Sequence, residues 1–297
     1  MESPQDDNDP TTVLRQNEKL LRGCASLKDA IALIPSLIHD PASSPPELIS
    51  HVGKTKHGRD IYILNGLAES CYYIPGYIDH CNVLELLDEI LTRMTDSPPN
   101  SNSLDQSRVH KHLWTEYSKN PDDLSASLNR LRWACVGYHY NWGERSYNKS
   151  AWSQFPKSFV KLYSSVLDDI NETVNGEKLS GSPQSAIINF YHGHRISDRL
   201  GGHRDDVEET DSTPLLSLSM GRSGIFLIEN QAICLRSGDV LVMAQKARQS
   251  LHGVPVVFPV KRNKSELDAL YTDRSWRENV EAFLEKTRIS ISIRQVY

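Results

Sequence analysis

Hydrophobic and polar positions alternate with a period of two in the last third of the chain, which predicts β-strands. Turn residues such as Gly221, Asn230 and Gly238 separate these short segments, and no helical pattern lies between them. Close strands without intervening helices favour an antiparallel sandwich or jelly roll over a parallel α/β sheet. We therefore expect a mainly β core with flanking helices (α+β), a double-stranded β-helix, over residues 185–297. The segments are SAIINFY, LLSLSMG, SGIFLIE, QAICLRS, DVLVMAQ and RISISIRQV.

Before residue 185 the apolar spacing predicts mainly helices and linkers, with a strand in RDIYILNGL. Apolar residues recur at three and four positions in NVLELLDEILTRM, and FPKSFVKLYSSVLDDI carries a proline where a first helical turn is expected. The sequence therefore predicts three regions ahead of the core. They are a disordered polar tail over residues 1–15, a helical segment and linker over 16–50, and, over 51–184, flanking helices together with a further segment that holds GYHYNW. Inside the core, residues 264–286 read as a helical or irregular insertion.

Composition and charge narrow the class of protein. The chain has 297 residues, 38% hydrophobic and 24% charged, with a net charge of −5, so no overall basic footprint attracts nucleic acid. Any polyanion would need local basic patches, and the candidates are Lys54, Lys56 and Arg59 and the cluster Lys261, Arg262 and Lys264. Five cysteines without a CxxC pair indicate reduced thiols and no cysteine zinc site. No apolar run is long enough for a membrane span, so we expect no membrane association.

A candidate metal site follows from three residues. His203 and Asp205 lie two apart, so on an extended segment both side chains point to one face, and His252 begins a later β-like run. Two histidines and a carboxylate on one face are typical of Fe(II) oxygenases, which leave three metal positions open. The acidic run after Asp205 reads as a solvated loop, although an acid near the metal could contact a base amine. Gly201 and Gly202 are expected to let the backbone turn the ligands inward.

The last predicted strand carries two arginines on one face. Arg288 and Arg294 are six residues apart, and buried arginines are costly unless they bind anions such as carboxylates. A dicarboxylate cosubstrate would supply both partners. Two surface charges are the alternative reading.

The order of these motifs resembles the AlkB-type Fe(II)/2-oxoglutarate dioxygenases over most of the body, and GYHYNW resembles the eukaryotic AlkB homologue one group. The resemblance implies iron ligands at His203, Asp205 and His252. It also implies 2-oxoglutarate contacts from Asn189, Tyr191, Arg288 and Arg294, with Arg288 at the distal carboxylate and Arg294 near the iron-side carboxylate. Tyr138, Tyr140 and Trp142 would lie in a nucleotide-recognition lid within residues 51–184, or else pack in the core. The family often reads Arg-x-Asn-x-Thr-x-Arg, whereas Ser290 and Ser292 stand in the middle here.

The resemblance further implies an enzyme that uses Fe(II), 2-oxoglutarate and dioxygen to demethylate N-methylated bases. The favoured substrate is N1-methyladenosine in tRNA, then methylated adenine in DNA, with hydroxylation of 5-methylcytosine as a further activity. Two rivals stay open: a 2-oxoglutarate oxygenase acting on methylated protein, and a catalytically silent nucleic-acid-binding scaffold. We expect a monomer in the cytoplasm or nucleus. The resemblance leaves the mitochondrion open, although the acidic start MESPQDDNDP gives no transit-peptide pattern.

Overall fold

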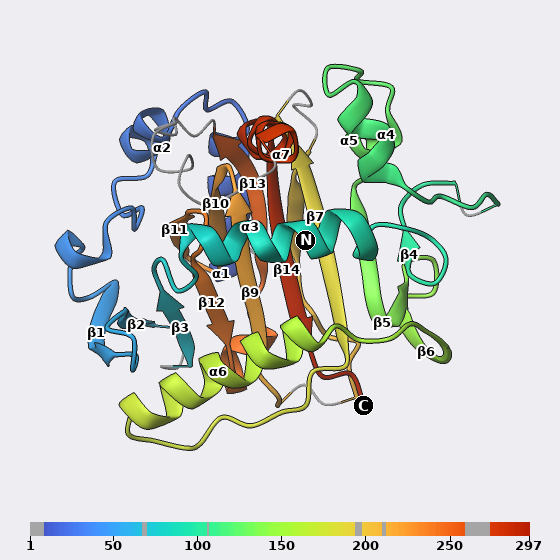
Figure 1. Ribbon diagram of the computed structural model, residues 1–297. Helices are drawn as coiled ribbons and strands as arrows, with labels where there is room; N and C mark the ends of the chain where they lie inside the picture. The colour runs from blue at the N-terminus through green and yellow to red at the C-terminus, as the bar shows by residue number, and fades with distance from the viewer. Residues whose placement is uncertain (1–8, 67–69, 106, 194–197, 210–211, 259–273) are drawn as a thin grey trace, which may run out of the picture.

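The computed structural model describes residues 9–297 except 67–69, 106, 194–197, 210–211 and 259–273. Within this part, the strands form two sheets (Figure 1). The ten-stranded major sheet has the order β1-β2-β3-β12-β9-β14-β7-β5-β4, with β6 paired to β5, and the minor sheet has the order β11-β10-β13-β8. Nearly all pairings are antiparallel, which confirms the predicted jelly-roll class.

Each strand of the major sheet has the following bounds: Ile49–Lys54 (β1), Asp60–Leu64 (β2), Cys71–Ile74 (β3), Ser101–Asn102 (β4), Trp133–Asn141 (β5), Ser146–Trp152 (β6), Ser185–His192 (β7), Leu215–Gly221 (β9), Val240–Met243 (β12) and Thr287–Arg294 (β14). The minor sheet contains Leu200–His203 (β8), Ser223–Ile228 (β10), Gln231–Leu235 (β11) and His252–Phe258 (β13). All six strand segments expected after residue 185 are present.

Three clusters of buried apolar side chains hold the two sheets and the helices together in layers. One cluster lies between the two sheets and includes Tyr73, Leu241 and Phe226. A second packs α3 (His80–Glu89), the π-turn Ile90–Met94, α6 (Lys157–Thr173) and α7 (Arg274–Lys286) on the major sheet. The third packs α1 (Pro10–Leu21) and α2 (Leu27–Leu33) on the minor sheet. Each sheet therefore has both of its faces covered. The space between the two sheets can open as a cavity at one end.

The smaller elements connect these layers. They are α4 (Leu113–Lys119), α5 (Ser127–Arg130) and the 3-10 turns Pro41–Ser43 and Gln245–Gln249. None of the described helices is long and apolar enough to cross a membrane. The four cysteines with described side chains carry free thiols, as the sequence indicated.

Two predicted boundaries are wrong. Residues 10–15 are helical and not a disordered tail, because Asp9 caps α1, Pro10 occupies its first turn and Leu14 is fully buried against the minor sheet. The barrel strands also begin well before residue 185. The strands β1–β5 belong to the major sheet, so residues 51–184 supply part of the core as well as its flanking helices.

Candidate metal centre and substrate cavity

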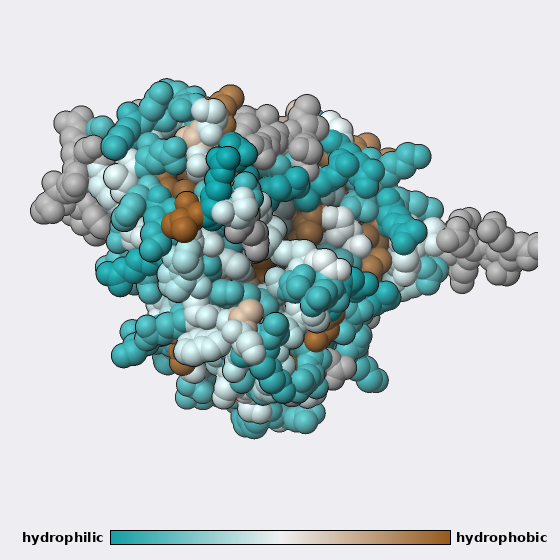
Figure 2. All heavy atoms as spheres, turned by 90° about the vertical axis from the view of Figure 1, so that its right-hand side faces the viewer, coloured by the Kyte–Doolittle hydropathy of each residue, from teal (hydrophilic) through white to brown (hydrophobic). Residues whose placement is uncertain are grey.

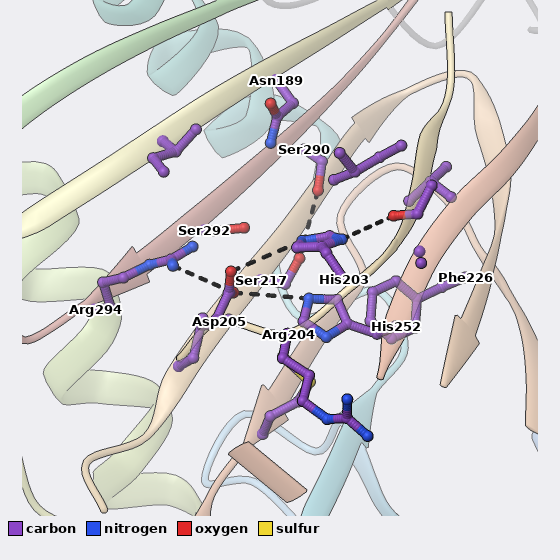
Figure 3. Close-up of a pocket in the computed structure, with 18 of the residues that line it drawn as sticks. Asn189, His203, Arg204, Asp205, Ser217, Phe226, His252, Ser290, Ser292 and Arg294 are labelled. Atoms are coloured by element: carbon purple, nitrogen blue, oxygen red, sulfur yellow. Dashed lines mark hydrogen bonds and ion pairs between the residues drawn. The ribbon is translucent and has the colours of Figure 1, made fainter. Parts of the chain in front are cut away.

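Three side chains converge where β8 ends and β13 begins. His203 is the last residue of β8, His252 is the first of β13, and the two are register partners across the strand pair. Asp205 lies two residues after His203 in the sequence. Its carboxylate oxygens lie 3.7 Å from Nε2 of each histidine. One ligand atom from each residue lies within 4.8 Å of the other two. Figure 3 shows Asp205 between the two imidazoles and Arg294.

Backbone carbonyls fix the tautomer of both histidines. Nδ1 of His203 lies 2.9 Å from the carbonyl oxygen of Gly201, and Nδ1 of His252 lies 3.0 Å from that of Ser250. Because a carbonyl only accepts, each Nδ1 carries the proton and donates it. Each Nε2 therefore presents a lone pair toward Asp205, as a metal ligand requires.

The lowered pKa values of Asp205 and His252 also suit a metal. Burial alone would raise the pKa of Asp205, but Arg294 and then the two histidines outweigh it and hold that pKa well below its usual range. Burial lowers the pKa of His252 to about 4. Metal binding needs a carboxylate and neutral imidazoles, and the lowered pKa values of Asp205 and His252 favour these forms. Two imidazole nitrogens and one carboxylate fit Fe(II) with three open positions.

A cavity of about 490 Å³ opens directly beside this triad. One wall is the inner face of β14 with Ser290, Ser292 and Arg294. The neighbouring strand β7 adds Asn189 and Tyr191, two of the residues expected to contact 2-oxoglutarate. The structure thus brings three of the four expected cosubstrate residues to one cavity, and their roles stay predictions.

Arg288 lies on the same face of β14 but does not line this cavity. Its guanidinium is fully buried and donates to the carbonyls of Arg222 and Leu235 at 3.3 Å and to Oγ of Ser219 at 2.8 Å. Burial lowers the pKa of this group. Among the described residues, Nε of Arg288 and Nε of Arg294 have no hydrogen-bond partner. Arg294 lines the cavity, so its unpaired donor fits a carboxylate such as 2-oxoglutarate would provide, whereas the contact of Arg288 with 2-oxoglutarate stays a prediction.

The lid residues are placed differently from one another. Tyr140 and Trp142 line the cavity, whereas Tyr138 does not and packs edge-on against Tyr297 with ring centroids 4.8 Å apart. Strict alternation would put Tyr138 and Tyr140 on one face. A register shift between these two residues in the β5–β6 pair breaks that alternation.

The acidic run after Asp205 is not a solvated loop throughout. The side chain of Glu208 is fully buried and lies 2.8 Å from Nη1 of Arg294 and 3.3 Å from Nη2 of Arg248. Among the described acids of this run, Asp206 and Glu209 fit the prediction of exposed side chains. They pair with Arg145 at 3.1 Å and with Lys149 at 3.4 Å on the β5–β6 hairpin. The run therefore joins the metal loop to both the core and the lid.

The glycines near the ligands serve close packing and not a turn. Neither Gly201 nor Gly202 has a positive φ. A Cβ on Gly202 would lie 2.8 Å from Cδ2 of Leu14, and one on Gly253 would lie 2.8 Å from the carbonyl oxygen of Leu200. The expected inward turn is thus wrong. Small residues here let α1 and the β8–β13 pair approach each other.

Sequence reasoning missed several residues at the site. Phe226 stacks on His252 with ring centroids 5.6 Å apart, and Ser217 lies 3.4 Å from Ser290 in the cavity wall. The signal for Ser217 was its place in LLSLSMG, where a small polar residue repeats on a buried strand. Arg248 gave no local signal. Of the proposed basic patches, Lys54 pairs with Asp60, and residues 261–264 lie outside the described residues.

Most of the chain matches a known protein family. The sequence profile described as "2OG-Fe(II) oxygenase superfamily" matches residues 70–294. The chain belongs to this superfamily and is of the AlkB type. Fe(II), 2-oxoglutarate and dioxygen are the cofactor and cosubstrates of the family. The predicted resemblance and its cofactors are confirmed.

Several characterised relatives are similar over long segments. A "DNA N(6)-methyladenine demethylase ALKBH1A" of Arabidopsis thaliana is 30% identical, with 75% of this chain and 67% of the relative covered. A "Nucleic acid dioxygenase ALKBH1" of Mus musculus is 36% identical over 44% of this chain and 33% of the relative. A "tRNA demethylase abh1" of Schizosaccharomyces pombe is 30% identical over 56% and 53%. The chain thus spans from a third to two thirds of these relatives.

A solved structure supports the fold. "The structure of OsALKBH1" superposes with a TM-score of 0.50 at 20% identity, and the match covers 76% of this chain and 96% of the other. At this identity the match bears on architecture alone, and it agrees with the two-sheet arrangement.

Proposed function

We propose that this protein oxidatively demethylates N-methylated bases in nucleic acid. The observation that carries the proposal is that Tyr140 and Trp142 line the same cavity as His203, Asp205 and His252. Aromatic faces hold an unstacked base by stacking, and an oxidising metal must reach the methyl group of that base. The names of the relatives, which mention DNA, RNA and tRNA, agree with a nucleic-acid substrate.

The surface beside the lid fits a polar partner. Figure 2 shows the face on the β4–β6 side, where apolar residues appear only as small separate patches among hydrophilic ones. A protein partner held by apolar contact would need a larger continuous patch. This supports nucleic acid over methylated protein as the ligand at this face.

The chain's own residues bind, orient and shield the reacting groups. With iron, 2-oxoglutarate and dioxygen bound, the centre supplies oxidation of a methyl group to hydroxymethyl, with release of succinate and carbon dioxide. Arg294 and the serines of β14 would hold the cosubstrate against one wall, while Tyr140 and Trp142 orient the base from the lid. A hydroxymethyl group on a ring nitrogen leaves as formaldehyde, whereas on carbon it is stable. This chemistry allows both demethylation and hydroxylation.

The order of substrates is part of the proposal. We infer N1-methyladenosine in tRNA first and methylated adenine in DNA second, with 5-methylcytosine as a substrate for hydroxylation. The test incubates the protein with Fe(II) and 2-oxoglutarate and each modified strand, and also with methylated peptides. Succinate, formaldehyde and the product nucleosides are measured together.

The outcomes separate the candidates. Formaldehyde release with a methylated strand, abolished in His203→Ala and retained in the exposed control His51→Ala, supports the proposal. Turnover of peptides alone would favour the protein oxygenase. A His203→Ala protein that folds, binds nucleic acid and preserves the cellular role would favour the scaffold.

A further inference from the structure

A second, smaller cavity of about 140 Å³ adjoins the main one. The two cavities share Trp142, Asn189, Tyr191 and Leu200 in their walls, so these residues form a common partition. We call the smaller cavity the flanking site. Its remaining walls are Arg132, Trp133, Phe190, Asp198 and Arg199.

We propose that the flanking site binds the nucleotide next to the one whose base enters the main cavity. This inference rests on the proposed function, because it assumes that the main cavity receives a base. It adds that the enzyme recognises at least two consecutive nucleotides of a single strand. The ligand is a base and its phosphate, recognised by indole, guanidinium and carboxylate groups.

Two indole rings offer a stacking surface at the flanking site. The rings of Trp133 and Trp142 have centroids 5.3 Å apart and an interplanar angle of 40°. The side chain of Trp142 is 45% exposed although it stands between two cavities. A large exposed indole is poorly explained by core packing, and base stacking on such rings is tolerant of sequence. Trp142 can therefore contact the base in the main cavity and its neighbour.

The partition has a clear structural origin. Trp133 is on β5 and is the register partner of Asn189 on β7. The other end of β5 pairs with β6 and forms the lid. The flanking site thus lies where the lid joins the major sheet, beside Leu200 at the start of β8. A nucleic-acid strand whose modified base enters the main cavity would therefore place its next nucleotide at the flanking site.

Two arginines at the flanking site have no partner in the described part of the chain. Arg132 and Arg199 are exposed, and neither side chain makes a hydrogen bond or an ion pair with a described residue. Other cations near the metal loop are already engaged. Arg145 pairs with Asp206, and Lys149 pairs with Glu209. Arg132 and Arg199 are therefore available to a phosphate, for which guanidinium is a suited donor.

A buried acceptor completes the site. Asp198 is only 5% exposed, and its Oδ2 accepts a hydrogen bond from the backbone nitrogen of His192 at 2.9 Å. Its Oδ1 is buried without a partner among the described residues. Buried polar atoms are normally satisfied, so an unpaired oxygen in a cavity wall indicates a ligand donor. The N–H edge of a base supplies one.

The test compares two substrates that carry the same modified base. One is the methylated nucleoside monophosphate, and the other is a five-nucleotide single strand with that base in the centre. In Arg132→Ala/Arg199→Ala we expect KM for the five-nucleotide strand to rise about tenfold, because two guanidinium–phosphate pairs are removed. We expect KM for the monophosphate, and kcat for both substrates, to stay the same. Lys157→Ala/Lys161→Ala is the matched control, because these exposed cations lie on α6, which packs on the face of the major sheet away from the cavity.

A binding measurement keeps this inference distinct from the proposed function. Fluorescence anisotropy with an unmodified five-nucleotide strand reports affinity without turnover. In the double arginine variant, the slope of log K against log salt should fall by about 0.7 for each phosphate that is no longer neutralised. If no methylated strand is turned over, the proposed function fails, while this slope still decides the flanking site. An unchanged slope, or equal rises in KM for both substrates, would overturn the inference.

Discussion

Glu208 and Arg294 are joined by a contact of 2.8 Å between side chains that are 0% and 5% exposed. Arg294 in turn lies 3.2 Å from Asp205, and Arg248 contacts the other oxygen of Glu208. Two arginines and two acids thus form one buried network behind the metal centre. The network sets the direction in which the carboxylate of Asp205 faces.

Removing the charge of Glu208 should destabilise the fold. Glu208→Gln leaves Arg248 and Arg294 with one buried anion between them, and such a change costs about 3–5 kcal/mol. Glu209→Gln, whose side chain is 61% exposed, should change the free energy of unfolding by less than about 0.5 kcal/mol. Denaturant unfolding of the metal-free proteins measures both. Equal stability of the two variants would show that the network contributes nothing.

Gly253→Ala should weaken metal binding without touching a ligand. Its new Cβ would lie 2.8 Å from a backbone oxygen of Leu200, so the β8–β13 pair must separate and displace His203 from His252. We expect iron affinity to fall by at least about tenfold. Gly23→Ala meets nothing within 4 Å and serves as the control. Retention of full iron affinity in Gly253→Ala would mean that the strand pair tolerates the widening.

Arg288→Lys should weaken 2-oxoglutarate binding and leave iron binding intact. The lysine keeps a positive charge but lacks Nε, the donor of Arg288 that has no partner among the described residues. Removing one charge-assisted hydrogen bond corresponds to a decrease in affinity of about tenfold or more. Calorimetric titration of the iron-loaded protein with 2-oxoglutarate gives the value, with the exposed Arg59→Lys as control. If the affinity does not change, the distal carboxylate lies elsewhere.

The ion pairs between the metal loop and the hairpin should hold the lid closed. Asp206→Asn/Glu209→Gln removes two exposed pairs, each worth at most about 1 kcal/mol, so global stability should barely change. Amide hydrogen exchange should nevertheless speed up over residues 138–152 and stay unchanged in β9. Asp60→Asn, which breaks exposed pairs on β1–β2, provides the comparison. Unchanged exchange across the hairpin would rule out this role.

The sequence predicted the parts of the site that depend on local spacing. His203 and Asp205 share an extended segment, and Arg288 and Arg294 lie on one face of a regular strand. The burial of Glu208 was missed because its partners lie 40 and 86 residues away. Tyr138 was misplaced because a register shift between Tyr138 and Tyr140 in the β5–β6 pair breaks the alternation of side chains.

The N-terminal helix shows the same limit. Asp9 and Pro10 are an adequate start signal for a helix, but the surrounding residues are too polar to predict an ordered segment. Burial of Leu14 and Leu21 against the minor sheet supplies the missing stabilisation, and that surface exists only once the sheet has formed. Tertiary packing therefore decides whether α1 is ordered.

The pairing of His203 with His252 makes the metal centre a sensor of strand register. Because side chains alternate along a strand, a slip of one residue between β8 and β13 would turn one imidazole to the opposite face. A chain that misaligned these strands could still form two sheets, yet it would lack the third ligand. Iron binding therefore requires the native alignment of β8 and β13, and bound iron stabilises only molecules in which these two strands are correctly aligned.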